Sequence, residues 1–456
     1  MDAVLLADIG STFTKVYSVD LDHIELMGRA QAPTTVHTDV MDGFERALFE
    51  LKTLTGSLHF SRKLICSSAA GGLEVAVSGL VESLTLKAAK HAALGAGAKV
   101  IRGFHHELTN EDLGYIKEHN IDIFLLAGGT DGGNKEVIIS NARHIAGLGV
   151  NFPVVVAGNR NASDQVTAIL KNAGMDVFVC PNILPDLETM ETGPVNNIIR
   201  QIFMDRIIKA KGISALNELS DNDIVPTPYA VLKASKLLSE GAGSLPGLGC
   251  LMTVDAGGAT TDVHSICDGY TRDDVLYEGL QEPRVMRTVE GDIGVRWNID
   301  SILALMGELP GDYDGFAERV KKDPSVLFGP EGAAFETEVA AKAVETAVGR
   351  HCGTLTKQFT PRGARFVQKG KDMTGTRALV ATGGPVSRSS KPLGIIKGAL
   401  FNESNPESLR PENPDIYIDT DYIMASAGLL SEISEEKALI YMNKYLRRIE
   451  TGVRND

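Results

Sequence analysis

The chain has 456 residues, which is too long for one hydrophobic core, so we expect two or more domains. A net charge of -14, with 43% hydrophobic and 23% charged residues, is typical of a globular protein and argues against general binding to nucleic acid or to an anionic membrane. No run approaches the roughly 18 uncharged apolar residues of a membrane span, and no signal-peptide core precedes the first strand, so we expect a cytoplasmic protein.

The chain begins with an acidic residue and a glycine between two apolar runs, in the stretch LLADIGSTFTKVYSVD. We expect strands at residues 4–7, 16–19 and 24–30, joined as a meander. Residues 39–54 are apolar at helical spacing, with Asp39 as the expected N-cap. A further strand is expected at 63–66.

Residues 74–182 alternate between short apolar runs and amphipathic segments. Strands are expected at 74–77, 99–103, 121–126, 153–157 and 176–180, and helices at 83–94, 110–119, 134–146 and 162–173. Such alternation is typical of a parallel sheet covered by helices, and we interpret it as an inserted domain. The strand at 121–126 could instead belong to the sheet that begins the chain.

Two glycine-rich loops of this region follow strands, AGGTDGGN at 127–134 and AGNRN at 157–161. Each lies at the carboxyl end of a strand, where open α/β sheets usually hold ligands or partners. The first could bind an anion at a helix N-terminus or could be an ordinary turn, and both interpretations stay open.

The next segments are expected to be helical. An acidic turn followed by a long helix is expected within 186–208, and a second helix at 229–240. A helix at 336–349 carries Lys342, which could approach a ligand or belong to a solvated face, and the final helix is expected at 435–450.

The stretch MTVDAGGATTDVHS, residues 252–265, repeats the pattern found at the start of the chain. Asp8 corresponds to Asp255, Gly10 to Gly257, Ser11 to Gly258 and Thr14 to Thr261. Glycine lets a backbone turn tightly beside an anion while its N–H groups point at it. Because an internal repeat outweighs local propensity, we predict two phosphate-binding hairpins that hold one polyphosphate between two lobes.

This pairing resembles the superfamily of sugar kinases, heat-shock chaperones and actin. The stretch VATGGPVS at 380–387 is similar to the family's adenosine loop, TVEGDIGVRW at 288–297 to its further nucleotide-contacting turn, and IMASAGLL at 423–430 to its last small-residue helix. The resemblance implies an α/β fold, with two ribonuclease H-like (actin-like ATPase) lobes around a nucleotide cleft and an inserted parallel α/β domain in the first lobe. The implied domains are 1–73 and 183–248 for the first lobe, 74–182 for the insert and 249–456 for the second lobe.

The resemblance also implies the site residues for ATP and Mg²⁺. Asp8 and Asp255 would hold the hydrated metal, Lys15 would pair with a phosphate, and Glu191 or Glu188 would orient the attacking water. The residues expected to contact the nucleotide are Gly10, Ser11, Thr12, Gly257, Gly258, Thr260, Glu290, Gly291, Gly383, Gly384 and Ser387.

The five cysteines include no C-x-x-C pair and are odd in number, so neither a disulfide framework nor a zinc ribbon is expected. Each is predicted to pack as a small hydrophobic residue. Scattered cysteines also disfavour a reductive activase, a relative that holds an iron–sulfur cluster between subunits. A small-molecule kinase remains an alternative, although no stretch indicates its general base.

The set ADIGSTFTK, CSSAAGG, AGGTDGGN, VDAGGATTDVHS, TVEGDIGVR and ATGGPVSR is similar to the MutL proteins associated with glutamate mutase. This resemblance implies an ATP-hydrolysing chaperone that reactivates an adenosylcobalamin-dependent mutase by exchanging damaged cobalamin, with the 74–182 insert as a client-binding domain. The lower-ligand pattern D-x-H-x-x-G is absent, because Cys267 follows Asp262 and His264 where glycine is required. We therefore expect any contact with cobalamin to occur through the mutase, and self-association is left open.

Overall fold

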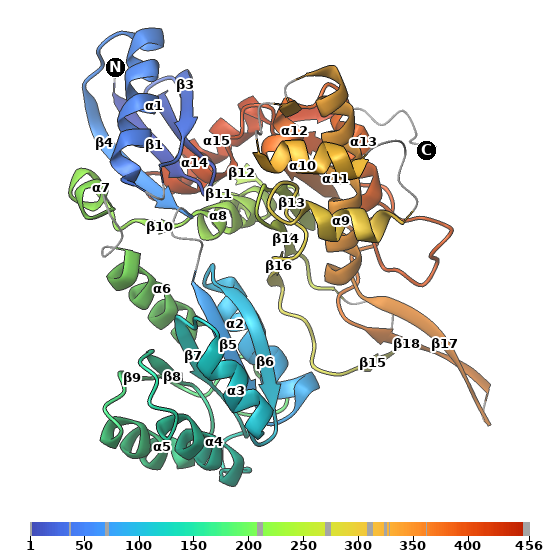
Figure 1. Ribbon diagram of the computed structural model, residues 1–456. Helices are drawn as coiled ribbons and strands as arrows, with labels where there is room; N and C mark the ends of the chain where they lie inside the picture. Colours follow the sequence, from blue (N-terminus) through green and yellow to red (C-terminus); the bar gives the residue numbers. More distant parts are fainter. Residues whose placement is uncertain are drawn as a thin grey trace. The chain divides into compact units, whose positions relative to one another are not determined.

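The structure is a computed structural model that describes residues 2–35, 38–68, 73–207, 213–269, 275–307, 313–322, 326–327, 329–361 and 363–449. The chain divides into two compact units (Figure 1). The larger is formed by Met1–Ala69 with Lys211–Asp456, and the smaller by Ala70–Ala210. No described helix has the length and hydropathy needed to cross a membrane.

The first sheet of the larger unit contains the predicted meander. In spatial order its strands are β10 (Val225–Pro226), β4 (Phe60–Ser67), β1 (Ala3–Ile9), β2 (Phe13–Asp20) and β3 (Glu25–Pro33). The first three strands along the chain pair antiparallel, whereas β4 lies parallel to β1. Every residue of β1 is buried, as a central strand requires.

The second sheet has the same plan. In spatial order its strands are β16 (Val285–Glu290), β14 (Thr261–Ile266), β13 (Leu251–Ala256), β19 (Ala378–Thr382), β20 (Asp415–Ile418) and β21 (Arg447–Ile449). Again three strands form an antiparallel meander, and β19 lies parallel to β13 as β4 does to β1. The predicted repeat is thus confirmed, and the larger unit has two lobes built on the same strand plan.

Helices surround these sheets and carry much of the core. In chain order they are α1 (Val40–Thr55), α7 (Ile213–Leu219), α8 (Thr227–Glu240), α9 (Ile299–Met306), α10 (Tyr313–Lys322), α11 (Pro330–His351), α12 (Gly384–Arg388), α13 (Pro392–Ile396), α14 (Met424–Leu430) and α15 (Glu435–Tyr445). Asp39 accepts a hydrogen bond from Met41 N and caps α1 as predicted.

One hydrophobic cluster joins the two lobes. It contains Leu6 of β1 and Val380 of β19, together with buried residues of α8, α14 and α15. The hairpins of both lobes are therefore mounted on one continuous apolar core.

Three strands form a small sheet at the edge of the second lobe, in the order β15 (Val275–Glu278), β18 (Gly363–Lys369) and β17 (Thr354–Thr360). The last two form a long antiparallel ribbon (Figure 1). Two very short strands, β11 (Gly241–Ala242) and β12 (Leu245–Pro246), complete the strands described in this unit.

The smaller unit has the parallel sheet that the sequence predicts. In spatial order its strands are β6 (Lys99–His105), β5 (Glu74–Gly79), β7 (Ile123–Leu126), β8 (Val154–Val156) and β9 (Val177–Val179), and all neighbours are parallel. The helices are α2 (Lys87–Gly95), α3 (Asn110–Glu118), α4 (Glu136–Ala146), α5 (Arg160–Asn172) and α6 (Gly193–Ile207). Because β7 is central here, the alternative placement of 121–126 in the other sheet is wrong. The domain limits 74–182 and 183–248 stay predictions.

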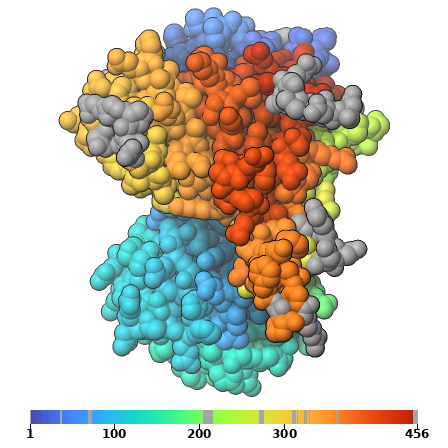
Figure 2. Space-filling model, turned by 90° about the vertical axis from the view of Figure 1, so that its right-hand side faces the viewer, coloured from blue at the N-terminus to red at the C-terminus, as the bar shows by residue number. Residues whose placement is uncertain are grey.

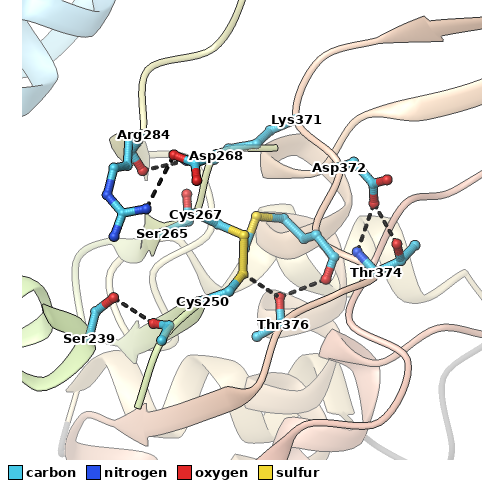
Figure 3. The surroundings of a disulfide bond; sticks show 12 residues. Ser239, Cys250, Ser265, Cys267, Asp268, Arg284, Lys371, Asp372, Thr374 and Thr376 are labelled. Carbon is cyan, nitrogen blue, oxygen red and sulfur yellow. Dashed lines mark hydrogen bonds and ion pairs between the residues drawn. A yellow bond between two sulfur atoms is a disulfide. The ribbon is translucent and has the colours of Figure 1, made fainter. Parts of the chain in front are cut away.

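The prediction of five unpaired cysteines is wrong for two of them. Cys250 and Cys267 form a disulfide bond (Figure 3). The register of β13 and β14 pairs Leu251 with Ile266, so the two cysteines lie opposite each other one residue further out, with Cα atoms 4.7 Å apart. Of the remaining three, Cys66 and Cys352 are buried and Cys180 is partly buried.

The last predicted helix was also too long. The helix α15 ends at Tyr445, and the chain then adds β21 to the edge of the second sheet, antiparallel to β20. Pairing with an open strand edge thus outweighs the amphipathic pattern that continues past Tyr445.

Candidate nucleotide site

A cavity of about 220 Å³ lies where the two lobes of the larger unit meet. Both predicted hairpins line it, at the turns after β1 and β13. The residues predicted from sequence that line the cavity are Asp8, Gly10, Ser11, Thr12, Lys15, Asp255, Gly257, Gly258, Thr260, Gly384 and Ser387.

The two hairpin turns have the same hydrogen bond. Gly10 N donates to Phe13 O at 3.1 Å, and Gly257 N donates to Thr260 O at 2.9 Å. A Cβ atom would lie 2.7 Å from Phe13 O at the first glycine and 2.8 Å from Thr260 O at the second. Since such contacts are closer than real Cβ atoms make, both turns require glycine.

The hairpin tips approach each other across the cavity. A Cβ atom on Gly258 would lie 3.4 Å from Thr12 Oγ1, and that hydroxyl is buried without a hydrogen-bond partner among the described residues. The loop before α9 supports the second tip, because the backbone N–H groups of Arg296 and Trp297 donate to Gly258 O at 3.0 and 2.9 Å. The predicted turn at 288–297 thus lies directly behind the second phosphate hairpin.

Asp8 and Lys15 form an ion pair on the first hairpin. Lys15 Nζ lies 2.9 Å from Asp8 Oδ2 and 3.8 Å from the centroid of the Tyr422 ring. The other oxygen, Asp8 Oδ1, accepts a hydrogen bond from Thr227 Oγ1 at 2.7 Å, and the Cys66 thiol lies beside it at 3.7 Å. Burial raises the pKa of that thiol, so it stays protonated and can donate.

Asp255 is the equivalent carboxyl group on the second hairpin, but it has fewer partners. Its Oδ1 atom is buried and has no hydrogen-bond partner among the described residues. Burial, and then repulsion from Asp262, raises the pKa of Asp255 to about 7. A cation bound at this position would therefore stabilise the ionised form of Asp255, which burial disfavours.

Asp262 is satisfied by a buried arginine. Arg287 Nε donates to Asp262 Oδ1 at 2.9 Å, and Thr260 Oγ1 donates to Asp262 Oδ2 at 2.8 Å. Thr260 is thus oriented by β14 rather than free to rotate. Asp262 lines the cavity, although it was not predicted as a site residue.

The predicted adenosine loop follows β19 and leads into α12. Gly383 adopts a φ of 108°, and a Cβ there would lie 2.2 Å from Ala256 O, so this glycine lets the loop pass close to the end of β13. Gly384 and Ser387 line the cavity beside Arg388, which forms an ion pair with Glu336 of α11.

Five predicted residues are absent from the described lining of the cavity, and one of them is Glu188, the alternative to Glu191 in the smaller unit. Gly383 supports the loop from behind, as above. Glu290 pairs with Arg350 on the surface of the second lobe, and burial raises the pKa of Glu290. Gly291 O accepts a hydrogen bond from Asn298 Nδ2 at 2.7 Å, and Glu191 belongs to the smaller unit, so its predicted role stays a prediction.

Lys342, the alternative candidate on α11, pairs with Glu345 at 3.0 Å and does not line this cavity of described residues. The solvated-face interpretation therefore holds for it.

Several lining residues were missed from sequence. Thr227 begins α8 and Tyr422 precedes α14, and both lie far along the chain from the hairpins they contact. Arg29 and Gln31 reach the cavity from β3, in alternate positions of that strand. Only this alternation could have indicated them, since a meander beside a phosphate hairpin points every second side chain of β3 to one face.

The glycine-rich loop 127–134 of the smaller unit is held by side chains of neighbouring loops. Asn182 Nδ2 donates to Gly129 O and to Asp131 Oδ1, and Asn159 Nδ2 donates to Gly133 O and Asn134 O. These bonds favour the structural interpretation of the loop over an anion site.

Comparisons with known proteins agree with this geometry. The model of a family described as MutL protein matches residues 4–446. Protein MutL of Clostridium tetanomorphum is 42% identical over 465 residues, which covers 98% of this chain and all of that protein.

Two solved structures align along most of the chain at low similarity. The ethanolamine utilization protein EutJ from Carboxydothermus hydrogenoformans is 12% identical with a TM-score of 0.29, covering 96% of this chain and 90% of that one. A glycerol dehydratase reactivase is 11% identical with a TM-score of 0.36, covering 94% and 99%. Likenesses this weak say nothing about what the chain binds. The family match and the identity to Protein MutL are decisive, and the chain belongs to the MutL protein family.

Proposed function

We propose that this protein is a Mg²⁺-dependent ATPase that works as a chaperone and reactivates an adenosylcobalamin-dependent mutase, glutamate mutase or a related aminomutase. The observation that carries the proposal is the pair of equivalent glycine hairpins that line one cavity, with Asp8 buried on the first and Asp255 partly buried on the second. Membership of the MutL family supports the choice of client, through the resemblance to MutL proteins associated with glutamate mutase.

The donor set fits a metal-bound polyphosphate. Asp255 Oδ1 and Thr12 Oγ1 are buried polar atoms that lack hydrogen-bond partners among the described residues. Groups of this kind cost free energy unless a ligand satisfies them. Mg²⁺ usually keeps several waters and takes one or two carboxylates, which matches Asp8 and Asp255 better than a closed cage.

Each group of the chain would have its own contact with the bound nucleotide. The backbone N–H groups of the hairpins around Gly10, Ser11, Gly257 and Gly258 would donate to phosphate oxygens. Lys15 would turn from Asp8 to a phosphate and offset its charge. The loop at Gly384 and Ser387 would lie against adenosine, with Gly383 holding its path.

The cavity also indicates a change of shape on binding. Its volume of about 220 Å³ is below the range of about 300–1,000 Å³ that is usual for small-molecule sites. We therefore expect the lobes to open for the nucleotide and to close over it, which is how hinged ATPases convert phosphate loss into motion.

The alternatives receive less support from the residues described. A reductive activase needs accessible cysteines for its cluster, but Cys250 and Cys267 are bonded to each other and Cys66 and Cys352 are buried. Cys180 is partly exposed, and it lies in the smaller unit and not among the residues that line the cavity. A small-molecule kinase of the same superfamily would need a general base beside a second substrate. Cytoplasmic location stays a prediction. The absence of nucleic-acid and membrane partners also stays a prediction, and the net charge of -14 supports it.

The test uses glutamate mutase that has been inactivated with bound cyanocobalamin. Wild-type protein, Mg-ATP and fresh adenosylcobalamin are added, and mutase activity is followed with time. Parallel reactions contain Asp8→Asn, or a non-hydrolysable ATP analogue in place of ATP. Recovery with the wild type and ATP that both controls lack is the expected result.

ATP hydrolysis measured in the same samples tests the nucleotide site separately from the choice of client. Hydrolysis without recovery would contradict the choice of client and lead to other aminomutases or to a kinase substrate screen. Absence of both binding and hydrolysis would contradict the nucleotide site itself.

A further inference from the structure

The ribbon of β17 and β18 stands away from the second lobe and is here called the arm, residues 354–369. Its third strand, β15, pairs only with Phe366–Lys369 at the base. The outer half therefore has two strands, and the side chains described there are exposed on both faces. The arm is seen as a ribbon in Figure 1, and residues of this range reach the surface, in orange, in Figure 2. A two-stranded ribbon without a covered face gains little stability from its own contacts, so a partner that covers one face would stabilise it.

One face of the arm is aromatic and basic. The register places Lys357 opposite Phe366 and Phe359 opposite Ala364, so these four side chains share a face. Phe359 is 82% exposed and Phe366 is 41% exposed. Lys357 Nζ lies 5.5 Å from the centroid of the Phe359 ring. Contiguous exposed apolar surface marks interaction sites, and the two phenylalanine rings on this face provide such surface.

The charge of the arm is opposite to that of the chain. Residues 354–369 read TLTKQFTPRGARFVQK, with four basic residues and no acidic one, in a protein of net charge -14. Lys369 pairs with Glu278 at the base, whereas Lys357 and Arg365 form no ion pair within the described part of the chain. Their charges are therefore available to an acidic partner.

A groove of complementary character lies on the first lobe of the same unit, between β3 and the outer face of α1. Its volume is about 660 Å³, and we call it the α1 groove; it is lined by Ala32, Pro33, Asp42, Glu45, Arg46, Phe49 and Glu50. Phe49 is 72% exposed. The three carboxylates outnumber the one arginine, and none of them forms an ion pair among the residues described.

We propose that the arm of one copy of this chain docks in the α1 groove of a second copy. Phe359 would pack against Phe49, and Lys357, on the same face of the arm, would face Glu45 and Glu50. Arg365 pairs with Gln358 and lies on the other face of the arm, so it takes no part in this contact. The arm and α1 lie at opposite ends of the larger unit in Figure 1, so an arm does not reach its own groove.

Charge and side-chain chemistry favour a second copy of this chain over nucleic acid as the partner of the arm. Nucleic acid would meet a chain of net charge -14, which opposes the phosphate backbone outside the arm. A second copy supplies both the acidic rim and the exposed aromatic ring that the arm fits. The contact is head-to-tail, and it either closes into a pair with two equal contacts or continues into longer assemblies.

The test measures self-association of the full-length protein by sedimentation velocity over a wide range of concentrations. Lys357→Glu is expected to weaken association by about tenfold or more, because it places like charges opposite each other. Glu45→Lys/Glu50→Lys is expected to do the same, and the triple charge exchange that combines these changes is expected to restore association. Arg365→Glu, on the other face of the arm, is the control and should have a smaller effect. Phe359→Ser should weaken it, whereas Phe401→Ser, which changes another exposed phenylalanine, should not.

Far-ultraviolet circular dichroism and ATP binding confirm that each variant is folded. A wild-type chain that is monomeric at every concentration would overturn the proposal. So would association that survives Lys357→Glu and Phe359→Ser, or a triple charge exchange that fails to restore it. Loss of mutase binding by arm variants of a monomeric wild type would likewise overturn it and assign the arm to the client.

Discussion

Lys15 Nζ lies 2.9 Å from Asp8 Oδ2 and so neutralises a carboxylate that is only 1% exposed. The same ammonium lies 3.8 Å above the Tyr422 ring, which belongs to the segment before α14. The first hairpin is thereby connected to a helix that shares its core with both lobes. Movement of Lys15 from Asp8 to a phosphate would alter this connection, which links nucleotide binding to lobe position.

Substitution of Tyr422 tests that connection. Tyr422→Leu removes the ring below Lys15 and is expected to change ATP affinity by up to about tenfold, the size of a partly buried cation–π contact. Tyr422→Phe keeps the ring and should bind ATP like the wild type. Isothermal titration calorimetry measures the ATP affinity of both variants. An equal loss of affinity in the two would show that the contact of Lys15 with the ring does not contribute to ATP binding.

The raised pKa of Asp255, about 7, predicts an opposite pH dependence for metal binding and for stability. Mg²⁺ requires the carboxylate, so affinity for Mg-ATP should rise about tenfold per pH unit below 7 and level off above it. In the metal-free protein, the unfolded chain loses this proton near pH 4 and the folded chain keeps it to about 7. The folded state is therefore disfavoured by on the order of 1.4 kcal/mol per pH unit across that window, and the cost persists above it.

Asp255→Asn should accordingly be more stable than the wild type at pH 8, while the gap narrows toward pH 5. Urea denaturation with a chelator present measures the gap at both values. Asp300→Asn is the control, because it changes an exposed carboxylate that pairs with Lys321. Its stability difference from the wild type should not increase between pH 5 and pH 8 as that of Asp255→Asn does. A gap for Asp255→Asn that does not depend on pH would contradict burial as the cause of the shift.

The two hairpin glycines should be equally intolerant of a side chain. Gly10→Ala and Gly257→Ala each place a Cβ within 2.8 Å of a carbonyl oxygen, so the turn must open and its N–H groups must turn away from the phosphates. ATP binding should fall sharply in both. Gly114→Ala in α3, where a Cβ meets nothing within 4 Å, should raise stability by about 0.5–1 kcal/mol and leave ATP binding unchanged. Calorimetry and thermal unfolding report the two effects separately.

These hairpins were predictable because their signal is local. An aspartate, a glycine two residues later and a threonine four residues after that define a turn whose geometry depends on few other residues. The repeated pattern then predicted both lobes, and the alternation of strands and helices predicted the parallel sheet of the smaller unit. By contrast, Thr227 and Tyr422 reach Asp8 and Lys15 from segments more than 200 residues away, and no periodicity reports such contacts.

The disulfide is an intermediate case, since the sequence contained a signal that was not used. Once the turn at Gly257–Gly258 is predicted, residues equally distant from it are paired, and Leu251 must oppose Ile266. Cys250 and Cys267 follow as the next pair. The odd total of cysteines and the absence of C-x-x-C spacing concealed a pairing that strand register decides.

The buried pair of Arg287 and Asp262 should be costly to break from one side. Arg287→Met leaves Asp262 uncompensated in the interior, for which the usual loss is about 3–5 kcal/mol of unfolding free energy. The double variant Arg287→Met/Asp262→Asn should recover much of that loss, because the stranded charge is gone. Urea denaturation of the two singles and the double gives the coupling energy. A double variant no more stable than Arg287→Met would show that arginine packing, and not the charge, is what the lobe requires.

Reduction of the Cys250–Cys267 bond should lower stability without removing the hairpin. The bond joins residues 17 positions apart, and a closed loop of that length contributes about 3 kcal/mol by constraining the unfolded chain. Dithiothreitol should therefore lower the free energy of unfolding by about that amount in the wild type, and should have no effect on Cys250→Ser/Cys267→Ser. In a reducing cytoplasm the pair would exist as thiols, and the ladder from Leu251 to Ala256 would hold the strands without it. Mass spectrometry after alkylation gives the number of protected cysteines. Equal stability of the wild type with and without reductant would contradict a structural role for the bond.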